Sequence, residues 1–84
     1  MVSETDEAVF GKAQAGDRAA FAVLVERYQR RAFAVALRLL GNRADAEDAV
    51  QQAFFRLYES RAAYNPRWRL NTWFYRILTN ACVD

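Results

Sequence analysis

Apolar side chains recur every three or four residues along four segments of the chain, the spacing that places them on one face of an α-helix. The longest segment begins at Asp17, whose carboxylate is suited to accept hydrogen bonds from the free N–H groups of a first helical turn. It ends at Gly41-Asn42, and its length of about 36 Å makes it the central helix of the domain. The predicted inward stripe of this helix comprises Phe21, Leu24, Val25, Tyr28, Ala32, Val35, Ala36 and Leu39.

A shorter helix is predicted before it, from about Thr5 to Ala15. Ser3, followed three residues later by Asp6, is a candidate capping pair for its start, and Gly16 is suited to end it. The acidic residues 1–7 are expected to be frayed. They lack the apolar segment of a secretory signal, so none is predicted.

A third helix is predicted to begin near Asp45, because carboxylates in a first turn interact favourably with the positive end of the helix dipole. The apolar stripe of this helix consists of Ala46, Ala49, Val50, Ala53, Phe54, Leu57 and Tyr58. The opposite face carries Glu47, Asp48, Gln51, Gln52, Phe55, Arg56 and Glu59.

A loop from about Arg61 to Arg67 follows, because Pro66 has no N–H to donate and disfavours a helical conformation at Asn65. The last helix covers about Trp68 to Val83. Its predicted buried side consists of Leu70, Trp73, Ile77 and Ala81, with Phe74 and Leu78 flanking. No segment shows the alternation of a strand. The pattern therefore predicts an all-α fold, a compact bundle of three main helices plus a shorter N-terminal helix.

Composition narrows the class of protein. A length of 84 residues predicts one domain, residues 1–84. The absence of histidine removes most zinc sites and most general acid–base arrangements. A lone cysteine, Cys82, excludes an internal disulfide framework and is typical of a reducing, cytoplasmic location. No run of 18 apolar residues occurs, so no membrane insertion is expected.

Catalytic and metal-binding constellations are not evident in the sequence. Asp45, Glu47 and Asp48 are the best candidates for metal ligands, but a carboxylate cluster at a helix start is more typical of capping and a solvated face. Cys82 is predicted to be a half-buried apolar residue. No glycine-rich phosphate loop is present. We therefore expect no enzyme activity, no metal and no cofactor.

Charge and aromatic residues are unevenly distributed. Residues 1–60 carry a net charge of −1, whereas residues 61–84 carry +3 and include both tryptophans. This second part interleaves cations with flat rings, which is the chemistry that holds single-stranded nucleic acid. The candidate residues are Arg61, Tyr64, Arg67, Trp68, Arg69, Trp73, Tyr75 and Arg76, with Asn80 as an amide that can pair with a base edge. Composition leaves open that the rings are core and the arginines merely solvated.

The polar face of the third helix is a second candidate. Its acids and glutamines surround Phe55, an apolar residue predicted to lie outside. Such a face is suited to docking a basic protein, and an ordinary solvated face is the alternative.

Three motifs resemble conserved region 2 of bacterial extracytoplasmic-function sigma factors. They are GDRAAF at 16–21, DAEDAVQQAF at 45–54 and TWFYRILTN at 72–80, in the family's order and spacing. The resemblance covers nearly the whole chain from about Ala8. It implies a module of a longer factor, whose linker and −35-reading domain are not part of this sequence.

The resemblance implies two partners. The first is RNA polymerase, whose β′ clamp helices would dock on Asp45, Glu47, Asp48, Gln51, Gln52 and Phe55. The second is promoter DNA, because region 2 reads and helps to open the −10 element through its non-template single strand. A loop before the last helix receives a flipped base, and the last helix contacts neighbouring DNA. These roles fall on Tyr64, Asn65, Arg67, Trp68, Trp73, Arg76 and Asn80.

The loop departs from the family pattern. Many members read aromatic-Arg-Gly-acid, whereas this chain has Tyr64-Asn65-Pro66-Arg67. Proline cannot adopt the positive φ that glycine allows, so the loop backbone is expected to differ and the captured base stays open. An alternative function is a protein-interaction bundle, for example one that binds an anti-sigma factor, without sequence-specific DNA reading.

Overall fold

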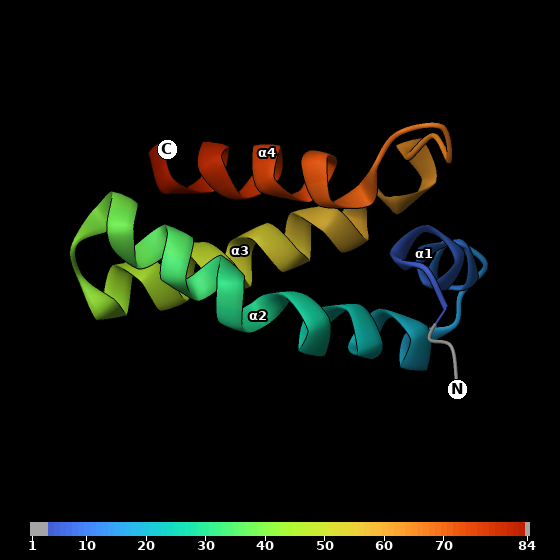
Figure 1. The fold of residues 1–84 in the computed structure, drawn as a ribbon, viewed down its shortest axis with the longest axis horizontal. Coiled ribbons are helices and arrows are strands. Elements are labelled where there is room, and N and C mark those ends of the chain that lie inside the picture. Colours follow the sequence, from blue (N-terminus) through green and yellow to red (C-terminus); the bar gives the residue numbers. More distant parts are fainter. Residues whose placement is uncertain (1–3, 84) are drawn as a thin grey trace.

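The longest predicted helix is present as α2 (Arg18–Leu40) in the computed structural model, which describes residues 4–83 (Figure 1). Asp17 caps it as expected, because its Oδ1 accepts a hydrogen bond from the Ala20 N–H at 3.1 Å. The helix ends at Gly41, which has φ of 69° and donates its N–H to the Leu37 carbonyl oxygen at 2.8 Å. A left-handed residue at this position is a common way to end a helix and favours glycine.

Helix α1 (Asp6–Gln14) begins one residue later than predicted. The suggested cap, Ser3, lies outside the described residues. Thr5 takes this role, and its Oγ1 accepts from the Ala8 N–H at 3.1 Å. A salt bridge of 2.8 Å joins Glu4 to Lys12, and Asp6 and Glu7 form the first turn of the helix.

Helix α3 (Arg43–Glu59) starts two residues before the predicted Asp45, because the Asn42 side chain caps it by accepting from the Asp45 N–H at 3.0 Å. The predicted inward stripe is confirmed except at its end, where Tyr58 is only half-buried. On α2, Leu39 was assigned to the wrong side: it is 55% exposed. The buried residues of α2 are Ala20, Leu24, Tyr28, Ala32 and Ala36.

A short 3-10 turn, η1 (Arg61–Ala63), and an irregular loop lead into α4 (Leu70–Val83). The predicted helix start at Trp68 is two residues too early, because Trp68 closes a turn by donating its N–H to the Asn65 carbonyl oxygen at 2.9 Å. The predicted face of α4 is also rotated: Phe74 and Leu78 are fully buried, whereas Trp73 and Ile77 are half-buried.

The rotation of α4 has a physical cause in the packing of rings. Phe74 stacks on Phe54 of α3 with centroids 4.9 Å apart, and it meets Tyr28 of α2 edge-on at 5.2 Å. A ring at this position fills the space between three helices, so α4 turns Phe74 inward and leaves Trp73 at the rim of the core.

The helices form the predicted all-α bundle (Figure 1). Helix α3 runs back along α2, and α4 returns along α3, while α1 lies across the end where α2 and α4 begin. The largest fully buried side chains are Phe10, Leu24, Leu57, Leu70, Phe74 and Leu78. Within residues 4–83, no helix is long and apolar enough to span a membrane.

We expect Gly41→Ala to lower the free energy of unfolding by about 1–2 kcal/mol, because an L side chain is disfavoured at this positive φ. Gly11→Ala is the matched control. Gly11 lies inside α1 with no atom within 4 Å of an added Cβ, so alanine should stabilise the protein by about 1 kcal/mol. Urea unfolding followed by circular dichroism measures both, and equal effects of the two substitutions would contradict the assignment.

Candidate nucleic-acid interface

A hollow lies where the loop enters α4. Its volume is about 410 Å³, and it is called the tryptophan hollow below. The lining residues are Trp68, Arg69, Thr72, Trp73 and Arg76. Four of them belong to the predicted DNA-contacting set. Thr72 was missed, although its position four residues before Arg76 places both on one helical face.

The two tryptophans form the apolar part of this hollow. Trp68 is 47% exposed, and its ring centroid lies 6.0 Å from that of Trp73 at an interplanar angle of 48°. The rings are tilted rather than stacked on each other, so part of the Trp68 face remains open. A flat ligand can therefore stack on this ring.

Tyr64 supports the hollow from inside. It is only 4% exposed, and its ring lies 5.2 Å from Trp73 and 6.2 Å from Trp68. Its hydroxyl donates a hydrogen bond to the Trp68 carbonyl oxygen. The ring predicted to contact DNA is thus buried, because it fills the core beneath the loop. Tyr64 holds Trp68 in place and offers no stacking face of its own.

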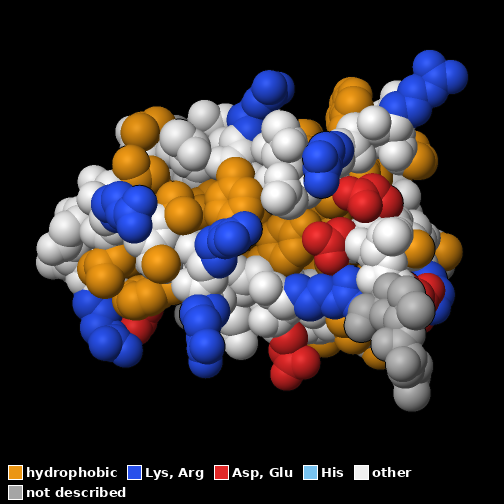
Figure 2. Space-filling view, in the orientation of Figure 1, with side chains coloured by type: hydrophobic (Ala, Val, Ile, Leu, Met, Phe, Trp, Pro, Cys, Tyr) orange, Lys and Arg blue, Asp and Glu red, His pale blue; other side chains and the backbone are white. Residues whose placement is uncertain are grey.

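Positive charge surrounds the entrance to the hollow. Arg67, Arg69 and Arg76 are exposed, and no acid occurs between residues 61 and 83. Along the upper edge of Figure 2, where α4 and the loop lie in Figure 1, the charged side chains are Lys or Arg. An Asx turn, in which Asn65 Oδ1 accepts from the Arg67 N–H at 2.9 Å, shapes the loop before Trp68. Cations beside an open indole are suited to phosphates and bases.

Arg61 and Asn80 lie apart from the hollow. The Arg61 guanidinium sits 4.0 Å above the centroid of the Tyr58 ring and donates to the Tyr58 carbonyl oxygen at 2.8 Å. Asn80 lines a shallow groove between α3 and α4. It follows Arg76 by four residues, so it lies on the same side of α4 one turn further along.

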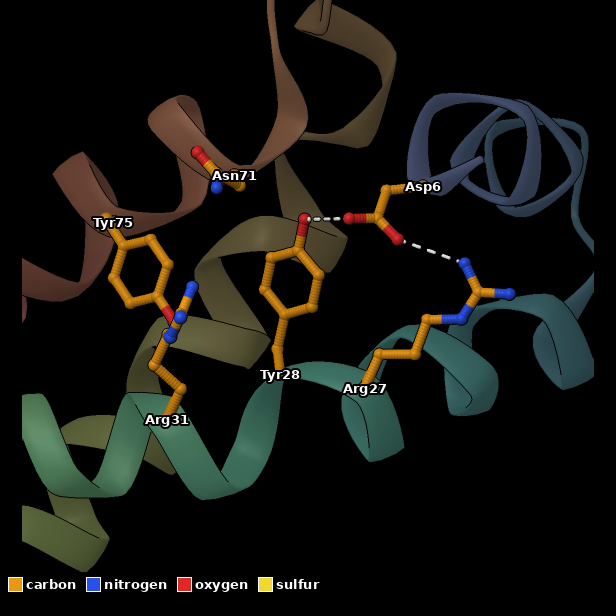
Figure 3. Close-up of a pocket in the computed structure, with 6 residues that line it drawn as sticks. All are labelled: Asp6, Arg27, Tyr28, Arg31, Asn71 and Tyr75. Atoms are coloured by element: carbon orange, nitrogen blue, oxygen red, sulfur yellow. Dashed lines mark hydrogen bonds and ion pairs between the residues drawn. The ribbon is translucent and has the colours of Figure 1, made fainter. Parts of the chain in front are cut away.

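Tyr75 lies in a separate polar pocket between α1, α2 and α4 (Figure 3). Its ring stacks on Tyr28 with centroids 6.3 Å apart. The Tyr28 hydroxyl donates to Asp6 Oδ2 at 2.7 Å, and Arg27 Nη1 donates to Asp6 Oδ1 at 3.0 Å. Arg31 and Asn71 complete the lining. Sequence reasoning missed this pocket, whose carboxylate ties α1 to α2.

The predicted docking residues lie together on the outward face of α3. All six are exposed: Asp45, Glu47, Asp48, Gln51, Gln52 and Phe55. Phe55 is 62% exposed and borders an apolar hollow beside Phe21 and Tyr58. Arg43 donates to Glu47 at 3.2 Å, so one acid of this face is already paired. A ring within an acidic and amide surface is suited to a protein partner.

Metal binding and thiol chemistry are the other functions to consider for the described residues. Between residues 4 and 83, no three His, Cys, Asp or Glu side chains come close enough to hold a metal ion. Cys82 is half-buried as predicted, and burial raises the pKa of its thiol.

The chain matches the family model for sigma-70 region 2 over residues 24–84. This match covers more than half of the chain, so the chain belongs to the sigma-70 region 2 family. The resemblance that the three sequence motifs indicate is thereby confirmed.

Similar proteins include two sigma factors. The ECF RNA polymerase sigma factor SigW of Bacillus subtilis is 39% identical over 69 residues, which are 82% of this chain and 37% of that protein. The ECF RNA polymerase sigma-E factor of Haemophilus influenzae is 37% identical over 80 residues, which are 95% of this chain and 42% of that protein. The chain therefore spans about two fifths of the length of these relatives.

A solved structure shares the fold with a TM-score of 0.87 and 34% sequence identity, over 96% of this chain and 86% of that one. It is the NMR structure of the complex formed by an engineered region 2 of sigmaE with GTAAAA.

The stability of the bundle should fall in alkaline solution. Burial and the hydrogen bond to Asp6 raise the pKa of Tyr28, and burial also raises the pKa of Tyr64 and of Tyr75. A raised pKa keeps the folded phenol neutral while the unfolded one ionises. Its stabilisation is therefore complete below about pH 10 and is lost as the pH rises further.

Tyr28→Phe tests this linkage. At pH 8 it should lower the free energy of unfolding by about 1–2 kcal/mol, because the hydroxyl no longer donates to Asp6. The difference from the unsubstituted protein should narrow toward about pH 11.5, since only the latter carries the ionisable phenol at position 28. Urea unfolding across this range measures the gap, and a constant gap would contradict the raised pKa.

Proposed function

We propose that this chain is a promoter-reading and polymerase-docking module of a transcription initiation factor. It binds the non-template single strand of the −10 element at the tryptophan hollow and docks on the β′ clamp helices through α3. It works in the cytoplasm, where its polymerase works, and catalyses no step itself. Residues 1–84 act as one domain in this proposal.

The observation that carries the DNA half of the proposal is the exposed Trp68 ring beside Trp73, flanked by Arg69 and Arg76. A base that stacks on an aromatic ring gains about 1–3 kcal/mol. Extruding a base from a duplex costs a few kcal/mol, so one indole and the contacts around it offset much of that cost. The arginines neutralise the phosphates on either side of the captured base.

The structural neighbour supports binding of a single strand by this fold. A region 2 domain with this fold is in complex with GTAAAA, so a single strand of this kind is a suitable first probe. Asn65 and Arg67 in the loop would contact the strand near Trp68. Asn80 would contact it one helical turn beyond Arg76 on α4. Tyr64 and Tyr75 take no part in direct contact here: Tyr64 supports Trp68, and Tyr75 packs on Tyr28.

The polymerase half of the proposal rests on the outward face of α3. Phe55 supplies a large exposed ring, and Asp48, Gln51 and Gln52 surround it with groups that pair with cations and amides. Electrostatic complementarity of this kind speeds association and sets the partner's orientation. An anti-sigma factor is a proposed competitor for this face, because covering it would withhold the domain from polymerase.

A second candidate function is a protein-interaction module in which the tryptophan hollow receives a protein segment. The half-exposed Trp68 favours it, because tryptophan is frequent at binding hot spots. The two candidates differ in salt dependence: phosphate contacts make affinity fall steeply with salt, whereas an apolar protein contact does so weakly.

Trp68→Ala should weaken binding of a fluorescein-labelled GTAAAA strand by about tenfold, the scale of one lost stacking contact. Arg76→Gln should lower affinity and make the plot of log K against log salt shallower by about 0.7, the contribution of one phosphate contact. Fluorescence anisotropy at several salt concentrations measures both effects.

Arg38→Gln, an exposed cation at the last turn of α2, is the matched control for charge and should change neither quantity by much. Equal losses for the substitutions at Arg38 and Arg76 would mean that the whole protein's charge, and not the hollow, binds the strand.

Asp48→Arg combined with Gln51→Ala should reduce capture by an immobilised β′ clamp-helix fragment by about tenfold or more, because it places a like charge against a basic partner. Glu26→Arg makes a similar charge reversal on the exposed side of α2 and should leave capture unchanged. Normal capture by the double variant would remove this face from the docking surface.

A further inference from the structure

Helix α1 reaches under the loop that leads to the tryptophan hollow. Gln14, the last residue of α1, donates its side-chain N–H groups to two loop carbonyl oxygens, those of Arg61 at 2.7 Å and Tyr64 at 3.3 Å. These carbonyls stand at the beginning of η1 and just after its end. One half-buried amide therefore pins both sides of the turn that precedes Trp68.

An apolar contact from the same helix supports the rings of the hollow. Phe10 is fully buried, and its ring meets Tyr64 edge-on with centroids 5.1 Å apart and Trp73 at 6.3 Å. Tyr64 in turn donates its hydroxyl to the Trp68 carbonyl oxygen. A chain of direct contacts thus runs from Phe10 through Tyr64 to the exposed Trp68.

The other end of α1 holds the start of α4. Glu7 Oε2 accepts a hydrogen bond from the Leu70 N–H, the first residue of α4, at 2.8 Å. A carboxylate at this position satisfies a free N–H and interacts favourably with the positive end of the helix dipole. The loop is therefore fixed by α1 at both of its ends, at residues 61–64 and at residue 70.

Helix α1 is itself anchored to the bundle. Asp6 pairs with Arg27 and accepts from the Tyr28 hydroxyl, both on α2 (Figure 3). None of Glu7, Phe10 and Gln14 lines the tryptophan hollow. The family match begins at residue 24, so it does not include α1.

We propose that α1 positions the tryptophan hollow, and that Gln14 is the positioning residue through which α1 sets the base preference. This inference rests on the proposed DNA-binding function and concerns its specificity. The amide of Gln14 faces the loop backbone and does not touch the strand. It fixes the turn at residues 61–64 and so fixes Tyr64 beneath Trp68.

Loss of this amide should affect base discrimination more than total affinity. Discrimination depends on the shape of the hollow around one base, whereas the phosphate contacts of Arg69 and Arg76 come from side chains at the surface. Without the amide, the Tyr64 carbonyl oxygen loses its side-chain donor, and that of Arg61 keeps only the 3.3 Å hydrogen bond from the Tyr64 N–H. The loop backbone then adopts other positions in which these oxygens reach water. Trp68 then presents its ring in more than one orientation.

A matched pair of substitutions isolates the donor. Gln14→Met keeps an unbranched side chain of similar length and removes the N–H groups, whereas Gln14→Lys keeps a donor for the same carbonyls. Ala36→Gly is the stability control, because glycine weakens the interior of a helix and Ala36 lies near the C-terminal end of α2. Figure 1 shows that this end of α2 lies away from α1.

The assay uses residues 1–84 and a preferred single strand selected from a random pool by the unsubstituted protein. The discrimination ratio is the affinity for this strand divided by that for its weakest single-base variant. Gln14→Met should lower this ratio about threefold or more, the scale of a lost hydrogen bond, and change binding of the weakest strand less than about twofold. Gln14→Lys should restore most of the ratio, and Ala36→Gly should not alter it.

Nuclear magnetic resonance gives a reading that is independent of DNA. The amides of Ala62 and Asn65 follow the two carbonyls that Gln14 holds, so their resonances should shift in Gln14→Met and stay near their original positions in Gln14→Lys. An unchanged ratio in Gln14→Met, or an equal fall in Ala36→Gly, overturns the proposal. If the unsubstituted protein selects no preferred sequence from the pool, the proposed reading of DNA sequence fails. Unshifted amide resonances at positions 62 and 65 in Gln14→Met would refute the positioning by Gln14 whatever the DNA result.

Discussion

The edge-on contact between Phe10 and Tyr64 is the interaction on which the candidate DNA site depends. Phe10 comes from the first helix and Tyr64 from the loop, yet their rings meet 5.1 Å apart with both side chains out of solvent. Burying two aromatic rings here provides the apolar floor on which Trp73 and Trp68 rest. Without these two rings, the loop would lack the apolar contacts that hold the Trp68 indole at the surface.

The bundle assigns its two proposed partners to different helices. The hollow belongs to the loop and α4, and the docking face belongs to α3. Each of the two helices packs one face against the shared core, in which Phe54 of α3 stacks on Phe74 of α4. Their other faces are thereby free to carry opposite chemistry, basic and aromatic on α4, acidic and amide on α3. A single small core thus supports both surfaces.

Polar contacts of α1 complement this apolar floor. Asp6, Glu7 and Gln14 reach α2, α4 and the loop, respectively, so a helix of nine residues is joined to every element around it. Such hydrogen bonds add less to the stability of the fold than burial of apolar side chains does. They depend on the direction of donor and acceptor, however, and so hold the loop backbone in one conformation. The first helix is therefore best regarded as part of the site's framework.

Local sequence determined much of this protein. The periodicity of apolar residues predicts all four helices, Asp17 and Gly41 mark the ends of the longest one, and the inward stripe of α3 is correct from Ala46 to Leu57. Three spaced motifs were enough to identify the family. These features are readable because caps and helical faces depend on residues only a few positions apart.

Only the tertiary structure decided the rest. Apolar residues cover so much of α4 that periodicity alone does not choose between Trp73 and Phe74 for the core. The rings of Phe54 and Tyr28 make that choice by leaving a space that Phe74 fills. In the sequence, Tyr64 is one more aromatic residue of a basic segment. Its burial depends on Phe10, which comes from the first helix. Gln14 contacts the carbonyl oxygen of Arg61, which is 47 residues away in the sequence. Folding alone brings these two residues together, so no local sequence pattern predicts their contact.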